Sequence, residues 1–210
     1  MSFQAAIHPL GLTVPGIGSN SFYGSLSCQS ECKHIIKTKL KAIKGNTYIG
    51  NERGNCVFTA DINRDNFLSD LQEYAVSLDK DHLEEIYKGV EETRFNHLVG
   101  IRNSIGIYIP TFFFFPIHIS LKNSPVPIFV GSSVKLAQEL EVINTTLQAK
   151  KHMDVNELPI KDKFEAEEED LEDYEADYEG MKNFWPCFTF HILEAMVKKG
   201  LEHKYPIFIF

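Results

Sequence analysis

The sequence predicts an α+β fold, in which a mixed or mainly antiparallel sheet packs against several helices. Residues 105–119 carry no formal charge and are alternating or continuously apolar, which is typical of buried strands. A further apolar run at 127–130 passes through Gly131-Ser132-Ser133 into a helical pattern at 134–147. Strands followed directly by a helix, with a large apolar content, indicate a sheet covered by helices.

Two more parts of the sheet are expected elsewhere in the chain. Residues 47–49 and 57–60 read as a hairpin, because the intervening residues 50–55 contain two glycines and two asparagines that favour turns. Residues 206–210 read as a short closing strand. The glycine- and proline-rich stretch before residue 26 leaves room only for a short strand at 12–14.

Apolar spacing predicts the helices that cover this sheet. We expect one helix over 27–44, another from Phe67 to Leu78, and a third from Asp81 toward Val99. The first has a serine near its start and Gly45 as its stop.

The acidity of the chain is concentrated in one segment. The net charge is −8, and residues 165–179 hold ten carboxylates with no Lys or Arg. The other 195 residues have 19 acidic and 21 basic groups, so they are close to neutral. The negative charge of the chain therefore comes from this one segment.

The acidic segment also has helical apolar spacing. Apolar residues from Phe164 to Ala195 recur at intervals of three, four or seven, and Gly180 and Pro186 divide the pattern into an acidic helix and a more apolar one ending at Gly200. Like charges four residues apart each oppose the helix by about 0.2–0.5 kcal/mol, so it needs docking or a cationic partner. We expect 1–210 to be a single α+β domain, with 164–200 as a helical arm docked on it.

Three uses of the acidic helix remain open. It is a solvated face, or it pairs internally with the lysines of 33–44, or it binds a basic protein partner. The third hypothesis gives a non-enzymatic binding protein, in its sharpest form a bacterial immunity-type protein that neutralises a cationic toxin such as a nuclease. Its partner-binding residues would be Glu168, Glu169, Asp170, Glu172, Asp173, Tyr174, Glu175, Asp177 and Tyr178.

An alternative hypothesis is a small enzyme or an anion-binding protein. Cys187, His191 and Glu194 lie on one flank of the predicted apolar helix, as a thiol, imidazole and carboxylate relay requires. Ser132 and Ser133 lie at a predicted helix start, where free amides and hydroxyls hold an anion or, alternatively, a serine simply caps the helix.

Metal, nucleic acid and membrane binding have weaker signals. Cys28, Cys32 and His34 are zinc-ligand types, but residue 34 points away from the other two on a helix and no fourth ligand is near, so we expect packed thiols and no cofactor. The basic cluster at 33–44 is short and poor in aromatics, which disfavours nucleic acid. Sparse cysteines, no recognisable signal peptide and prolines within 105–121 favour a cytoplasmic protein with no membrane span.

Overall fold

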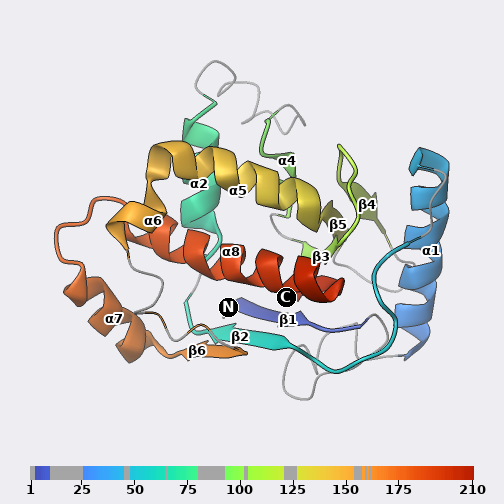
Figure 1. The fold of residues 1–210 in the computed structure, drawn as a ribbon, viewed down its shortest axis with the longest axis horizontal. Helices are drawn as coiled ribbons and strands as arrows, with labels where there is room; N and C mark the ends of the chain where they lie inside the picture. The colour runs from blue at the N-terminus through green and yellow to red at the C-terminus, as the bar shows by residue number, and fades with distance from the viewer. Residues whose placement is uncertain are drawn as a thin grey trace.

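The protein contains one mixed open sheet with helices on both faces (Figure 1). The computed structural model of the chain describes residues 3–9, 26–44, 48–64, 66–79, 93–101, 104–120, 127–153, 158, 160 and 162–210, with only the backbone of 26–29 and 44. Within these residues the sheet has seven strands in the order β4-β5-β3-β7-β1-β2-β6. The strands are β1 (Phe3–Ile7), β2 (Phe58–Ile62), β3 (Ile105–Ile109), β4 (Ile117–Ile119), β5 (Ile128–Ser132), β6 (Lys163–Ala166) and β7 (Ile207–Ile209).

Seven helices in the described residues complete the α+β class that the sequence predicts. They are α1 (Leu26–Lys44), α2 (Ser69–Ser77), α4 (Asn96–Val99), α5 (Ser133–Leu147), α6 (Ala149–His152), α7 (Glu168–Asp177) and α8 (Phe184–His203). The strand predicted at 12–14 and residues 81–92 of the helix predicted at 81–99 lie outside the described residues.

The sheet is mainly antiparallel, as expected. Four strand pairs are antiparallel, and two, β2 with β6 and β3 with β5, are parallel. β7 lies in the middle, antiparallel to β1 on one side and to β3 on the other.

The predicted hairpin between 47–49 and 57–60 is wrong. β2 pairs instead with β1, with Ala5 opposite Ala60, and with β6. Residues 48–49 are not in a strand, and the backbone N–H of Asn51 donates to Lys204 O at 2.7 Å. Pairing of β2 with β1 is favoured over the predicted hairpin because it buries Ala5, Ala6 and Ile7 completely in the sheet.

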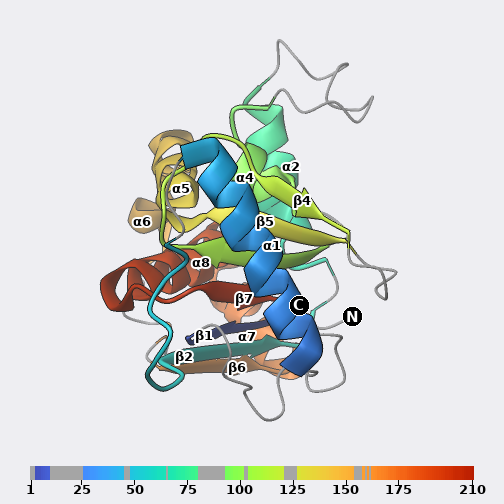
Figure 2. The same cartoon turned by 90° about the vertical axis from the view of Figure 1, so that its right-hand side faces the viewer.

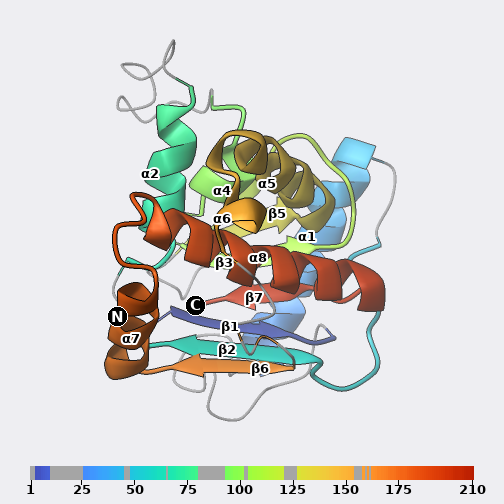
Figure 3. The ribbon, with the colours of Figure 1, turned by 60° about the vertical axis from the view of Figure 1, so that its left-hand side comes forward.

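The two faces of the sheet are covered unequally. α1 crosses one face and packs through Cys32, Ile36 and Leu40 on isoleucines of β3, β4 and β5 (Figure 2). The other helices cover the opposite face in a larger apolar core that runs from β5 to β6. α8 lies along this core and packs against α5 and α2, so it is the main buried helix (Figure 3).

The acidic arm begins differently from the prediction. Residues 163–166, where a helix was expected from Phe164, form β6, because Phe164 and Ala166 are buried while Lys163 and Glu165 alternate outward. The break at Gly180, which has φ +85°, and the start of a second helix near Pro186 are confirmed. α8 continues past Gly200 to His203 and ends at Lys204 in the left-handed conformation.

None of the helices in the described parts of the chain is both long and apolar enough to span a membrane.

Candidate functional site

The acidic helix α7 is anchored at its start and along one face. Glu167 and Asp170 form a reciprocal capping box, in which each side chain accepts a backbone N–H of the other residue. Leu171 is buried in the main core, and Tyr174 packs on Phe188 of α8 with ring centroids 5.7 Å apart. These contacts supply the docking that an acidic helix requires.

The ten carboxylates between 165 and 179 are all exposed to solvent. Glu165 pairs with Lys163, and Glu167 accepts a hydrogen bond from the Asn63 amide at 3.1 Å. No ion pair within the described residues neutralises the other nine, which are Glu167, Glu168, Glu169, Asp170, Glu172, Asp173, Glu175, Asp177 and Glu179. The arm therefore presents a strong negative field.

Among the described side chains, no lysine of α1 pairs with a carboxylate of the arm. α1 and α7 lie at opposite ends of the molecule (Figure 1). Lys33 and Lys37 both contact Glu52 at 2.9 Å instead, and their hydrogen bonds and charges lower the pKa of Glu52 to about 2. The sheet order separates the two helices, because α1 covers the β4 side and α7 follows β6 at the other edge.

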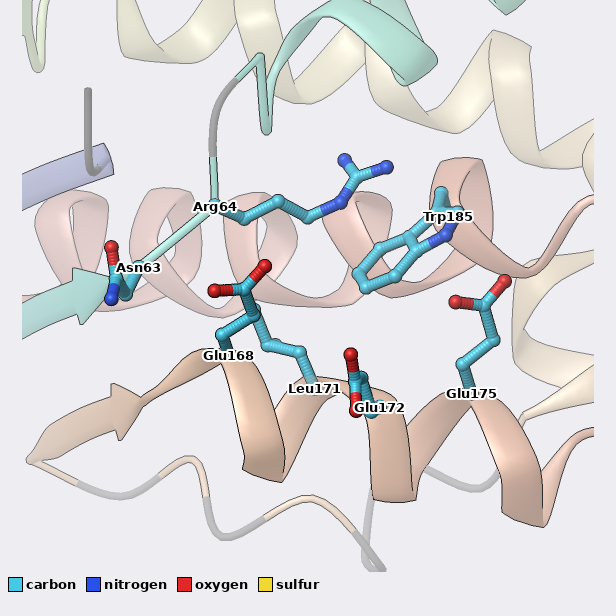
Figure 4. A pocket seen from close by; sticks show the side chains of 7 residues that line it. All are labelled: Asn63, Arg64, Glu168, Leu171, Glu172, Glu175 and Trp185. Atoms are coloured by element: carbon cyan, nitrogen blue, oxygen red, sulfur yellow. The ribbon is translucent and has the colours of Figure 1, made fainter.

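A groove of about 530 Å³ runs between α7 and the start of α8. Figure 4 shows Glu168, Glu172 and Glu175 rising from α7 toward Arg64 and Trp185 on the other side. The three glutamates share one face of the helix because they are spaced at i, i+4 and i+7. Asn63 and Leu171 complete the lining.

The cation in this groove is already balanced. The Arg64 guanidinium contacts the carboxylate of Asp70 and stacks over the Trp185 ring at 3.6 Å from the ring centroid. No local feature of the sequence predicts the groove, because Arg64 follows β2 and Trp185 lies in α8, and tertiary packing brings them together.

The two tyrosines grouped with the carboxylates by sequence have internal contacts. Tyr174 and Tyr178 are half-buried and pack on Phe188 and Phe184 of α8. Burial, and secondarily the charge of Asp170, raises the pKa of Tyr174. In the described structure both rings hold α7 in place.

The structure places Cys187, His191 and Glu194 on one helix, α8, but in different surroundings. Cys187 and His191 are buried, and desolvation raises the pKa of the Cys187 thiol to about 11. Glu194 is partly exposed and pairs with Lys150 of α6. A thiol with so high a pKa is a poor nucleophile near neutral pH.

Ser132 and Ser133 are fully buried at the start of α5. The Ser132 hydroxyl accepts the backbone N–H of Lys135 at 3.0 Å, so it caps the helix, which was the structural alternative in the sequence. Because both hydroxyls are buried, an anion in solvent has no access to them.

The three zinc-type residues lie in α1. Cys32 is buried under the helix while His34 is exposed, and no side-chain detail is described for Cys28. Throughout the described residues, no group of three or more His, Cys, Asp or Glu side chains could hold a metal ion.

A buried polar cluster that the sequence did not indicate links α4 with α5 and the end of β5. Both carboxylate oxygens of Glu139 accept backbone N–H groups, from His97 at 3.1 Å and Leu98 at 2.9 Å. His97 Nδ1 accepts the Ser132 N–H at 2.9 Å, its Nε2 lies 3.0 Å from Phe114 O, and burial lowers its pKa to about 4. The cluster ties α4 to β5 and α5, and it is closed to solvent.

Comparison with known proteins identifies a family for the chain. No curated protein and no solved structure matches the chain. A family model with the description "Putative DNA-mimic protein" matches residues 63–209, which include α7, α8 and every residue that lines the groove. Because this match extends over more than half of the chain, the protein belongs to that DNA-mimic family.

Proposed function

We propose that the protein is a non-enzymatic binding protein whose acidic arm occupies the DNA-binding surface of a basic protein. The observation that carries the proposal is the uncompensated row of exposed carboxylates on α7. Membership of the DNA-mimic family supports the same reading, since a protein that resembles DNA electrostatically competes with DNA for its binders.

The charge density of α7 suits this role. Its ten residues rise by about 1.5 Å each and so extend over about 15 Å. Seven of them are Asp or Glu, which gives one negative charge per about 2 Å of axis. Duplex DNA has one charge per about 1.7 Å of its axis, so a surface built for phosphates meets a comparable field.

The docking of α7 supports binding as well. Leu171 and the two tyrosines fix the helix on α8 before any partner arrives. A preformed row of charges loses less conformational entropy on binding than a flexible acidic tail. The carboxylates therefore act as a rigid surface.

The narrower form of the proposal concerns the partner. A cationic nuclease, neutralised in the cytoplasm of a bacterium by an immunity-type complex, has the basic active-site surface that such a row would cover. The protein itself should not bind duplex DNA, because like charges repel.

The test is capture of host proteins on the immobilised protein, followed by release with duplex DNA. We expect a basic protein to bind the unmodified chain, to leave on addition of duplex DNA or high salt, and to be lost when six arm carboxylates become amides. The variant is E168Q/E169Q/E172Q/D173N/E175Q/D177N, which keeps the Asp170 cap. A control, E73Q/E141Q/E202Q, removes exposed charge elsewhere and should bind normally.

Two results would contradict the proposal. One is a partner that stays bound in saturating duplex DNA, which would place its contact away from a DNA-binding surface. The other is equal capture by the six-site variant and the unmodified protein, because the α7 carboxylates would then contribute nothing.

No observation favours the enzymatic alternative over this proposal. The burial of Cys187 and the engagement of Glu194 with Lys150 oppose a thiol-imidazole relay. The burial of Ser132 and Ser133 opposes anion binding from solvent.

A further inference from the structure

We infer that the groove between α7 and α8 receives an arginine side chain of the basic partner. This rests on the proposed function and adds to it a defined point of attachment. The row of charges along α7 faces solvent over much of its circumference, and the face with Glu168, Glu172 and Glu175 lines a cavity.

The groove has an excess of negative charge. Arg64 lies in it, but its charge is balanced by Asp70, which it contacts directly. The three groove glutamates have no cation partner among the described residues, so three negative charges converge on the cavity. An incoming cation would balance part of this charge.

The shape and lining favour a guanidinium group. The cavity, about 530 Å³, is within the range of roughly 300–1,000 Å³ that holds small ligands, so it admits a long side chain. Carboxylates on successive turns of α7 offer paired acceptors for the planar fork of arginine. The Trp185 ring already stacks with one guanidinium, that of Arg64, and it stands across the groove from the carboxylates.

The groove and the outer face of α7 then have different roles. Exposed carboxylates on the outer face steer a basic protein and are screened by salt. A side chain enclosed in the groove is partly shielded from solvent and has one position, so it sets the orientation of the complex. Loss of the groove charges should therefore weaken binding more than loss of the same number of outer charges.

Trp185 gives a direct readout, because it is the only tryptophan in the chain. The probe is a capped tetra-arginine peptide, titrated at low ionic strength while Trp185 emission is followed. We expect a saturable change in emission for the unmodified protein, and at least fivefold weaker binding of tetra-lysine.

Two triple variants separate the groove from general charge. E168Q/E172Q/E175Q removes the groove charges, while E169Q/D173N/D177N removes three exposed charges from the other side of the same helix. We expect the first to weaken peptide binding at least tenfold with loss of the emission change, and the second to weaken it less than threefold. Far-UV circular dichroism checks the fold, and E172Q alone carries the test if the first triple unfolds.

The outcomes distinguish this inference from the proposed function. Equal weakening by both triples, or peptide binding by calorimetry without any change in Trp185 emission, would overturn the groove but leave the acidic surface intact. An emission change with calcium chloride alone, at matched ionic strength, would overturn it in favour of a metal. Unaltered peptide binding by both triples would count against the groove and the proposed function together.

Discussion

The buried Glu139 should contribute less to stability as the pH rises from 5 to 8, because it keeps its proton in the folded protein and loses it on unfolding. Burial raises the pKa of Glu139 from 4.5 to about 8, against the opposing effect of the two N–H groups of His97 and Leu98. A folded-state pKa above the unfolded value stabilises the protein fully below pH 4.5, and this contribution is lost as the pH rises through 8.

The size of the effect follows from the shift in pKa. Each unit corresponds to about 1.36 kcal/mol, so the contribution lost between pH 5 and pH 8 is about 3–4 kcal/mol. Glu139→Gln does not titrate, and its amide accepts only one of the two backbone N–H groups well, at a cost of about 1–3 kcal/mol. The variant should therefore be less stable than the unmodified protein at pH 5 and equal or more stable at pH 8.

Titration of His97 does not alter the comparison between the unmodified protein and Glu139→Gln. Burial lowers its pKa from 6.5 to about 4, so its contribution is present above pH 6.5 and is lost as the pH falls through 4. His97 therefore makes the protein more stable as the pH rises, which is opposite to the effect of Glu139. This contribution is the same in the Glu139→Gln variant if the contacts of His97 are kept.

Urea unfolding at pH 5, 6.5 and 8, followed by Trp185 fluorescence, measures the difference directly. Parallel pH dependence of the two proteins would refute the reasoning. It would mean that the N–H groups of His97 and Leu98 keep Glu139 ionised in the folded protein despite its burial.

Four further predictions concern packing and the arm. Leu171→Ala should lower the free energy of unfolding by about 2–5 kcal/mol and expose α7 to limited proteolysis, because this side chain is buried in the main core. Gly200→Ala should cost about 1–3 kcal/mol in thermal unfolding, since its Cβ would lie 2.8 Å from Ile207 Cγ1. Cys187 should resist a disulfide reagent at pH 8 and react in urea, as burial raises its pKa to about 11. If 1–210 is one domain, circular dichroism and Trp185 fluorescence should report a single unfolding transition, and two separated transitions would contradict this.

Local signals in the sequence predicted much of the fold. The apolar runs at β3, β5 and β7 and the spacing in α1 and α5 each depend on neighbouring residues alone. The Ser132 cap at the start of α5 is also a local feature, and it was one of the two readings of Gly131-Ser132-Ser133.

The missed strands depend on distant partners. β1 contains two alanines and only one β-branched residue, so its own sequence is a weak strand signal, and its burial comes from pairing with β2 and β7. β6 is four residues long, and Phe164 is seven residues before Leu171, so it also fits a helical pattern. Pairing with β2 decides in favour of a strand.

The site was predictable only in part. The carboxylate row is visible as composition, and its exposure follows from the charge. The groove was not visible, because Arg64 and Trp185 come from separate parts of the chain and meet through tertiary packing. The cluster of His97 and Glu139 has the same origin, since a carboxylate in α5 reaches the backbone of α4.

The central place of β7 has a consequence for synthesis on the ribosome. The strands β4, β5 and β3 on one side and β1, β2 and β6 on the other are all made before residues 207–209. Without those residues, half-sheets formed on the two sides would have inner edges, β3 and β1, with unpaired backbone groups. Closure of the sheet is thus a late event, and the two open edges are the points at which a nascent chain would associate with another copy or with a chaperone.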